Sequence, residues 1–116
     1  MTISFTVPLP PSVNHCYGRN RNYVYMKREA VAWKAIAKPI ICKVMENHAK
    51  LKGKVIVEMT VFWKDGRRRD TDNLMKLTLD VMKGVVFSDD FWSLPRVMDF
   101  SIDPLNPRLE ISARKA

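Results

Sequence analysis

The stretch KVIVEMTVFWK, residues 54–64, decides the fold because its apolar side chains alternate as those of a β-strand do. One face is fully apolar, with Val55, Val57, Met59 and Val61. The other face is mixed, with Ile56, Glu58, Thr60 and Phe62. The pattern predicts a strand at the centre of a sheet, with its apolar face against the core.

The sequence on either side of this strand predicts three more strands and two helices. The strands are expected at residues 3–7, 96–102 and 108–114, and the helices at residues 27–48 and 72–83, the second ended by Gly84. Pro39 interrupts the first helical run, where it predicts a kink or two abutting helices. Residues 12–25 are expected to form a polar loop. This order predicts an α+β fold with helices packed on one mixed β-sheet.

Length and charge limit the function further. The 116 residues suit one domain over residues 1–116, and a homodimer would help so small a domain to grip a long substrate. Lys and Arg number 20 against 12 Asp and Glu, a net charge of +8 that attracts phosphate-rich polymers. No apolar run approaches the ~20 residues of a membrane span, and MTISFTVPLPP has no signal-peptide pattern. A cytosolic protein without a membrane partner is expected.

Histidine and cysteine offer no metal site. Cys16 and Cys42 are too few and too far apart for a zinc motif, and a cytosolic location argues against a disulfide between them. His15 and His48 are equally isolated. Any metal site must therefore be built from carboxylates.

Carboxylates gather in RRRDTDNLMK, residues 67–76, where the central strand passes to the second helix. In an extended segment Asp70 and Asp72 lie on one side, about 7 Å apart at Cα. Asp89 or Asp90 offers a third acid after the helix. Two carboxylates about 4 Å apart repel by about 4 kcal/mol at an effective dielectric constant of about 20, so a convergent cluster requires a cation. Mg²⁺ prefers such ligands, and Mn²⁺ is a plausible substitute.

A simpler interpretation treats these residues as structural. One Asp at a helix start is commonly an N-cap, and Asp70 could pair with a neighbouring arginine. Three acids inside a strongly basic chain favour a metal site for phosphodiester hydrolysis instead. Arg67, Arg68 and Arg69 would then hold phosphate oxygens, and Lys76 would neutralise charge in the transition state.

The N-terminal loop supplies further candidates for DNA contact. Asn14, His15 and Tyr17 mix amide, imidazole and aromatic groups in a segment that also carries arginines. The simpler interpretation is a solvated loop, and the more specific one is a loop that contacts DNA. Asn73, beside the acidic pair, completes the set of candidate DNA-binding residues.

Three motifs resemble the RusA-type Holliday junction resolvases. RRRDTDNLMK looks like that family's Arg-rich Asp-x-Asp-Asn-x-x-Lys signature, PLPPSVNH (residues 8–15) is similar to its proline-rich opening, and the Asp89-Asp90 pair looks like its second acidic motif. The resemblance covers nearly the whole chain. It implies a homodimer, in a bacterial or phage-infected bacterial cell, that binds a four-way DNA junction and nicks two opposed strands with magnesium.

By this resemblance Asp70, Asp72 and Asp90 would be the catalytic metal ligands, and Lys76 the essential basic residue. Phe91-Trp92-Ser93-Leu94 departs from the family pattern, as an insertion, which leaves Asp89 open as the alternate ligand. Phe91 and Trp92 are expected in the core, although an exposed pair would wedge or stack against bases.

Two other functions use the same residues. A general branched-DNA or flap nuclease needs the same acids, and a non-catalytic basic nucleic-acid-binding module would use them only as caps and ion pairs. The nuclease interpretation is favoured, because a pure binder has no reason to gather acids inside a basic surface.

Overall fold

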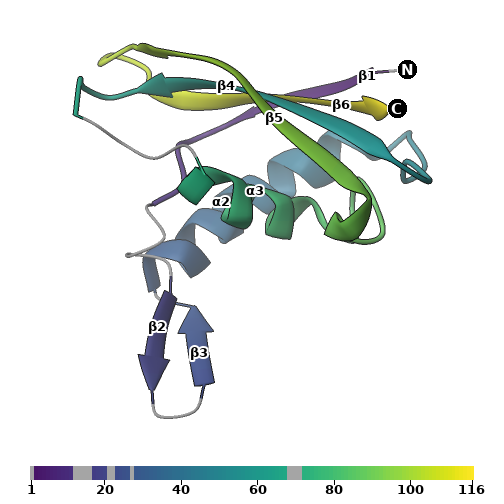
Figure 1. Ribbon diagram of the computed structural model, residues 1–116, viewed down its shortest axis with the longest axis horizontal. Helices are drawn as coiled ribbons and strands as arrows, with labels where there is room; N and C mark the ends of the chain where they lie inside the picture. Colours follow the sequence, from purple (N-terminus) through teal and green to yellow (C-terminus); the bar gives the residue numbers. More distant parts are fainter. Residues whose placement is uncertain (1, 12–16, 21–22, 27, 68–71) are drawn as a thin grey trace.

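A four-stranded mixed sheet, in the order β1-β6-β4-β5, forms the body of the protein (Figure 1). The computed structural model describes residues 2–11, 17–20, 23–26, 28–67 and 72–116; for residues 17–20, 23–26, 72, 73 and 90 it describes the backbone alone. The strands of the sheet are β1 (Thr2–Val7), β4 (Val55–Trp63), β5 (Ser93–Ile102) and β6 (Arg108–Lys115). β4 pairs antiparallel with β6 and parallel with β5, so it is central, as predicted.

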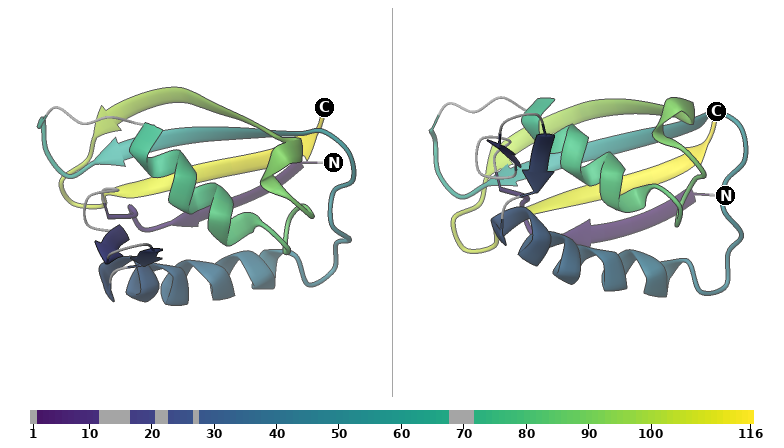
Figure 2. Two further views of the ribbon diagram at one scale, coloured as in Figure 1. Left: turned by 60° about the horizontal axis from the view of Figure 1, so that its bottom comes forward. Right: turned by 90° about the horizontal axis from the view of Figure 1, so that it is seen from below.

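Two helices cover one face of this sheet, α2 (Arg28–Val44) and α3 (Asp72–Met82) (Figure 2). The alternating residues of β4 face them: Val55, Val57, Met59 and Val61 are fully buried. Leu74, Leu77 and Val81 of α3 complete the core from the helix side, also as predicted. Gly84 ends this helical segment with a φ of +83°, which favours glycine. The α+β fold is therefore confirmed.

The expected loop at residues 12–25 is wrong where the structure describes it. Residues Tyr17–Asn20 (β2) and Tyr23–Met26 (β3) form an antiparallel hairpin, which projects away from the sheet (Figure 1). Tyrosine and valine have high β propensity, but the polar residues between them obscured the strand pattern. The two hairpin strands form a separate two-stranded sheet.

Pro39 does not divide the first helix. One continuous helix, α2, runs from Arg28 to Val44 with Pro39 inside it. Ala37 and Ile41 flank the proline and are completely buried, so core packing holds both halves in one helix despite the lost backbone donor. The helix also ends earlier than predicted, and residues 45–47 form a turn.

The connection from β4 through α3 to β5 determines where the site residues lie. β4 and β5 are parallel, and their pairing runs from Val55 with Ser93 to Trp63 with Ile102. The chain must therefore return along the sheet before it starts β5, and α3 makes that return. As a result, α3 begins near the carboxyl end of β4 and ends near its amino end (Figures 1 and 2).

Shortening a buried side chain of α3 is expected to destabilise the packing of this helix on the sheet. Leu77 is fully buried, so Leu77→Ala should lower the free energy of unfolding by about 2–5 kcal/mol through lost burial and a cavity. Urea unfolding measures the change. Leu105 is 97% exposed, so Leu105→Ala should change the free energy of unfolding by less than about 0.5 kcal/mol. Equal stabilities for the two variants would contradict the packing of α3.

Candidate active site

The segment between β4 and α3 carries the predicted cationic and acidic residues. Arg67 is strongly exposed, with 83% of its side chain accessible. Its backbone N–H donates to Asp65 Oδ1 over 3.0 Å, and its Nε lies 3.9 Å from Asp65 Oδ2. This contact anchors the backbone and leaves the guanidinium accessible at the carboxyl end of β4. Arg68, Arg69 and Asp70 lie outside the described residues.

The first turn of α3 contains the second group of predicted residues. Asp72 is the first residue of the helix, followed by Asn73, and Lys76 lies one turn later with its side chain exposed. Because residues four apart share a helix face, Asp72 and Lys76 belong to one side of α3, away from buried Leu74 and Leu77. The amino end of a helix also carries partial positive charge, which favours carboxylates and phosphates.

The Asp89-Asp90 pair lies where the chain enters β5. Asp90 begins the short 3-10 helix η1 (Asp90–Trp92). Asp89 is exposed, its Oδ1 accepts the Phe91 N–H over 3.1 Å, and its backbone carbonyl accepts the Trp92 N–H over 3.1 Å. Asp89 therefore acts as the cap of η1, which gives its carboxylate a structural role.

Within one chain, α3 separates the two acidic segments. Asp72 begins this helix of 11 residues, about 16 Å long, whereas Asp90 immediately precedes the β5 residues that pair with the start of β4. Among the described side chains of one chain, no three His, Cys, Asp or Glu come together as a metal site would require. The parallel crossover causes this separation, and the sequence did not fix the strand order that would have predicted it.

The β2–β3 hairpin lies at the same end of the molecule as the start of α3 (Figures 1 and 2). Tyr17 is the first residue of β2, while Asn14 and His15 lie outside the described residues. The chain segments that carry Tyr17, Arg67 and Asn73 therefore share one end of the fold, although they are distant in sequence.

Phe91 and Trp92 are not core residues, which corrects the expectation from sequence. Phe91 is 79% exposed and Trp92 42% exposed. Their rings meet edge to face, with centroids 5.2 Å apart. Both belong to η1, which lies directly before the edge strand β5.

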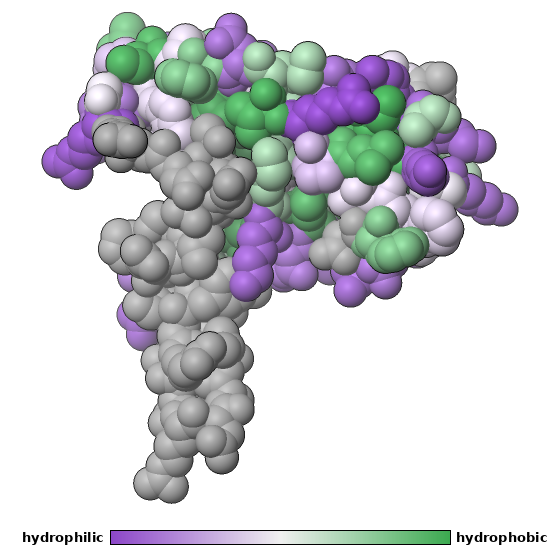
Figure 3. Space-filling model, in the orientation of Figure 1, coloured by the Kyte–Doolittle hydropathy of each residue, from purple (hydrophilic) through white to green (hydrophobic). Residues whose placement is uncertain are grey.

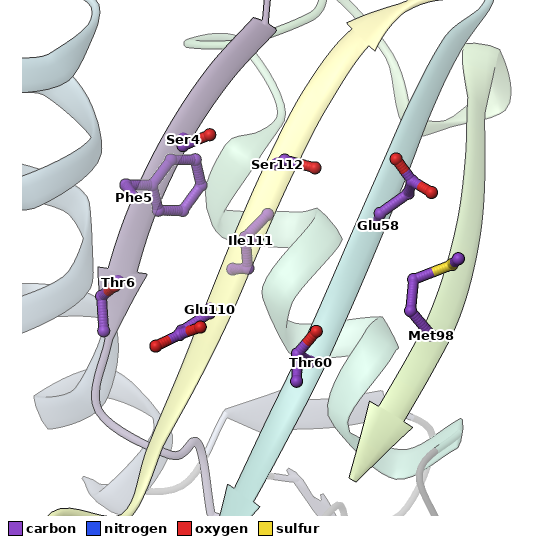
Figure 4. A pocket seen from close by; sticks show the side chains of 9 residues that line it. All are labelled: Ser4, Phe5, Thr6, Glu58, Thr60, Met98, Glu110, Ile111 and Ser112. Atoms are coloured by element: carbon purple, nitrogen blue, oxygen red, sulfur yellow. The ribbon is translucent and has the colours of Figure 1, made fainter.

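A hollow of about 480 Å³ lies on the open face of the sheet, away from these residues (Figure 4). It is lined by Ser4, Phe5, Thr6, Glu58, Thr60, Met98, Glu110, Ile111 and Ser112. Its carboxylates form ion pairs, Glu58 with Arg114 and Glu110 with Arg108. Hydrogen bonds to Glu110 and Asp103 raise the pKa of Arg108. These pairs explain the acids of the hollow without a ligand.

No helix in the described part of the chain is long and apolar enough to cross a membrane.

Comparison with known proteins identifies the family. The profile described as "Endodeoxyribonuclease RusA" matches residues 8–114. The crossover junction endodeoxyribonuclease RusA of Escherichia coli K12 is 32% identical over 102 residues, 87% of this chain and 81% of the relative. The corresponding protein of Enterobacteria phage 82 is 30% identical, over 87% of this chain and 81% of the relative. That of Enterobacteria phage HK97 is 29% identical, over 74% of this chain and 71% of the relative. The chain belongs to the RusA family of endodeoxyribonucleases.

Proposed function

We propose that this chain is a magnesium-dependent endonuclease, a single nuclease domain over residues 1–116, that resolves four-way DNA junctions by paired nicks in recombination and repair. The observation that carries the proposal is the family match over residues 8–114, which includes both acidic segments. Relatives from bacteria and phages are named crossover junction endodeoxyribonucleases. The cytoplasm of a bacterial or phage-infected cell is the compartment where such a substrate occurs.

The donor set suits a hard divalent cation. The family implies a divalent-metal nuclease, and Asp70, Asp72 and Asp90 provide carboxylate oxygens of the kind that Mg²⁺ prefers, with Mn²⁺ as a substitute. The bound ion would stabilise charge on the scissile phosphate and lower the pKa of a water nucleophile. The exposed ammonium of Lys76, one turn after Asp72, would bind a phosphate oxygen beside these carboxylates.

A homodimer reconciles this donor set with the fold. Because α3 separates Asp72 from Asp90 in one chain, we assign the third carboxylate of each site to the partner's Asp90. In a dimer with a two-fold axis, each copy contributes this carboxylate to the site of the other copy. The dimer therefore has two equivalent sites. Two equivalent sites match the chemistry of paired nicks on opposed strands.

The remaining candidates would hold the DNA around these sites. Arg67, Arg68 and Arg69 precede the acidic pair, and guanidinium groups bind phosphate oxygens in bidentate fashion. The β2–β3 hairpin, whose first residue is Tyr17, projects from the same end of the fold as the start of α3. Asn14 and His15 precede it in the sequence. This end therefore combines the first turn of α3, which carries Asp72 and Lys76, with a protruding element for a branched substrate.

Loss of one ligand charge should abolish cleavage without loss of binding. Asp70→Asn and Asp72→Asn should each bind a synthetic four-way junction as tightly as the wild type, because the cationic residues remain. Each should cut it more than about 100-fold more slowly, since metal stabilisation of the transition state contributes several kcal/mol. Gel-shift binding and strand-resolved cleavage with Mg²⁺ measure the two effects.

Glu46→Gln is the matched control for these variants, because Glu46 is an exposed carboxylate in the turn after α2. It should bind and cut normally. Near-normal cutting by Asp70→Asn and Asp72→Asn would show that the two aspartates only cap the helix. Tight binding by the wild type without any cutting would favour a non-catalytic binding module, and equal cutting of flaps would favour a general branched-DNA nuclease.

Substitutions of Asp89 and Asp90 should differ in their effect on cleavage. Asp90→Asn should lose cleavage as severely as Asp72→Asn. Asp89→Asn should retain most activity, because an asparagine oxygen can still accept the Phe91 N–H that Asp89 accepts over 3.1 Å. Cleavage at saturating junction over a magnesium titration measures both variants. Activity in Asp90→Asn together with a dead Asp89→Asn would reverse the assignment.

A further inference from the structure

Five lysines from three distant segments gather at the end of the molecule where β4 begins. Leu51 forms a bridge with Phe87, and Phe87 forms another with Lys83, so the loop before β4 lies beside the turn after α3. The carboxyl end of β6 joins them, because the Ala116 N–H donates to the Lys54 carbonyl over 2.9 Å. Figures 1 and 2 show these segments at one end of the fold. We call the five residues the lysine patch: Lys50, Lys52, Lys54, Lys83 and Lys115.

The charge of the lysine patch is not neutralised by acids of the same segments. Residues 50–54, 83–88 and 115–116 contain five lysines and no aspartate or glutamate. All five lysines are exposed, and within the described part of the chain none of them forms an ion pair. Lys34, by contrast, pairs with Asp80. Hydrophilic side chains project at this end of the molecule in Figure 3. A cluster of five uncompensated cations attracts a polyanion.

Two exposed aromatic side chains adjoin the lysine patch. Ser93 pairs with Val55 in the parallel ladder, so Trp92 lies beside Lys54, one residue earlier on each strand. The rings of Phe91 and Trp92 lie at 85° to each other, an edge-to-face arrangement that leaves ring faces open for contact. Proteins that bind single-stranded nucleic acid combine cations, which bind the phosphates, with aromatic rings, on which the bases stack. This end of the molecule has both components.

We propose that the lysine patch and the Phe91–Trp92 pair bind an unpaired stretch of a DNA strand at the branch of the junction. The lysines hold its phosphates, and the aromatic pair stacks on its bases. The inference rests on the proposed function for its choice of ligand, because Asp90, a proposed metal ligand, directly precedes Phe91. A strand that is cut at a site containing Asp90 must pass this surface.

The structure disfavours the other large anionic ligand, a membrane surface. Lysines beside aromatic side chains also bind anionic lipids, but stable binding requires a helix with an extended apolar face that lies in the lipid interface. The η1 helix that carries Phe91 and Trp92 has three residues and offers no such face. The two rings suit a contact with one or two bases instead.

The salt dependence of junction binding tests the lysine contacts without any cutting. A synthetic four-way junction is titrated in EDTA at several salt concentrations. Lys52→Gln and Lys54→Gln should each reduce the slope of the log binding constant against log salt by about 0.7, the contribution of one phosphate contact on a single strand. Lys38→Gln is the matched control, because it removes the same charge from an exposed lysine of α2. It should leave the slope unchanged.

The fluorescence of Trp92 tests the aromatic contacts. Trp33 and Trp63 are only 5% and 9% exposed, so a base that stacks on tryptophan reaches Trp92 alone. Junction binding should quench the wild-type fluorescence, and Trp92→Phe, which keeps a ring, should bind as tightly without quenching. Phe91→Ala and Trp92→Ala should each raise the Kd for the junction at least about 5-fold, through loss of a base–aromatic stack. Neither should change the Kd for a linear duplex, whose bases are all paired.

The outcomes separate this surface from the proposed function. Unchanged salt slopes in both lysine variants, an equal change in Lys38→Gln, or junction binding without quenching would overturn the surface. Loss of binding to phosphatidylserine vesicles, with junction binding unchanged, would overturn it in favour of a membrane. The expected slopes and quenching in a protein that cuts no junction with Mg²⁺ would support the surface and contradict the nuclease. Normal cutting with unchanged slopes would do the reverse. Circular dichroism verifies the fold of each variant.

Discussion

The parallel pairing of β4 with β5 is the constraint on which the rest of this structure depends. Two adjacent parallel strands start at the same end of a sheet, so the chain must return along the sheet between them. α3 makes this return, and its buried face of Leu74, Leu77 and Val81 covers the apolar face of β4. The same crossover places the first turn of α3 at one end of the sheet and the entry to β5 at the other.

This separation lowers the electrostatic repulsion among the carboxylates within one chain. If all three acids met within one chain, their repulsion would have to be balanced by a cation in every folded molecule. With the acidic segments apart, one chain folds without the repulsion that Asp90 would add to Asp70 and Asp72. The proposed dimer creates the complete ligand set only when two copies associate. Folding and assembly of the site become distinct steps, and cutting competence becomes linked to chain concentration.

Sequence reasoning predicted the four strands of the main sheet and the two helices because their signals are local. The alternation in β4, the spacing of Leu74, Leu77 and Val81, and the glycine after α3 each depend on nearby residues alone. The continuous helix through Pro39 and the exposure of Phe91 and Trp92 depend on tertiary packing, which local patterns do not contain. The acidic candidates were chosen by residue type and spacing. The opposite positions of the first turn of α3 and of η1 follow from strand order, which one sequence does not specify.

The assignment of one carboxylate to each of two chains can be tested with mixed dimers. Asp72→Asn and Asp90→Asn chains with different tags would be co-expressed, and the heterodimer purified through both tags. In the proposed dimer one of its two sites retains both wild-type carboxylates, so the heterodimer should nick one strand of a four-way junction, whereas each parent homodimer should be inactive. A purified heterodimer as inactive as both parents would contradict the account, because it would place both carboxylates of each site in the same chain.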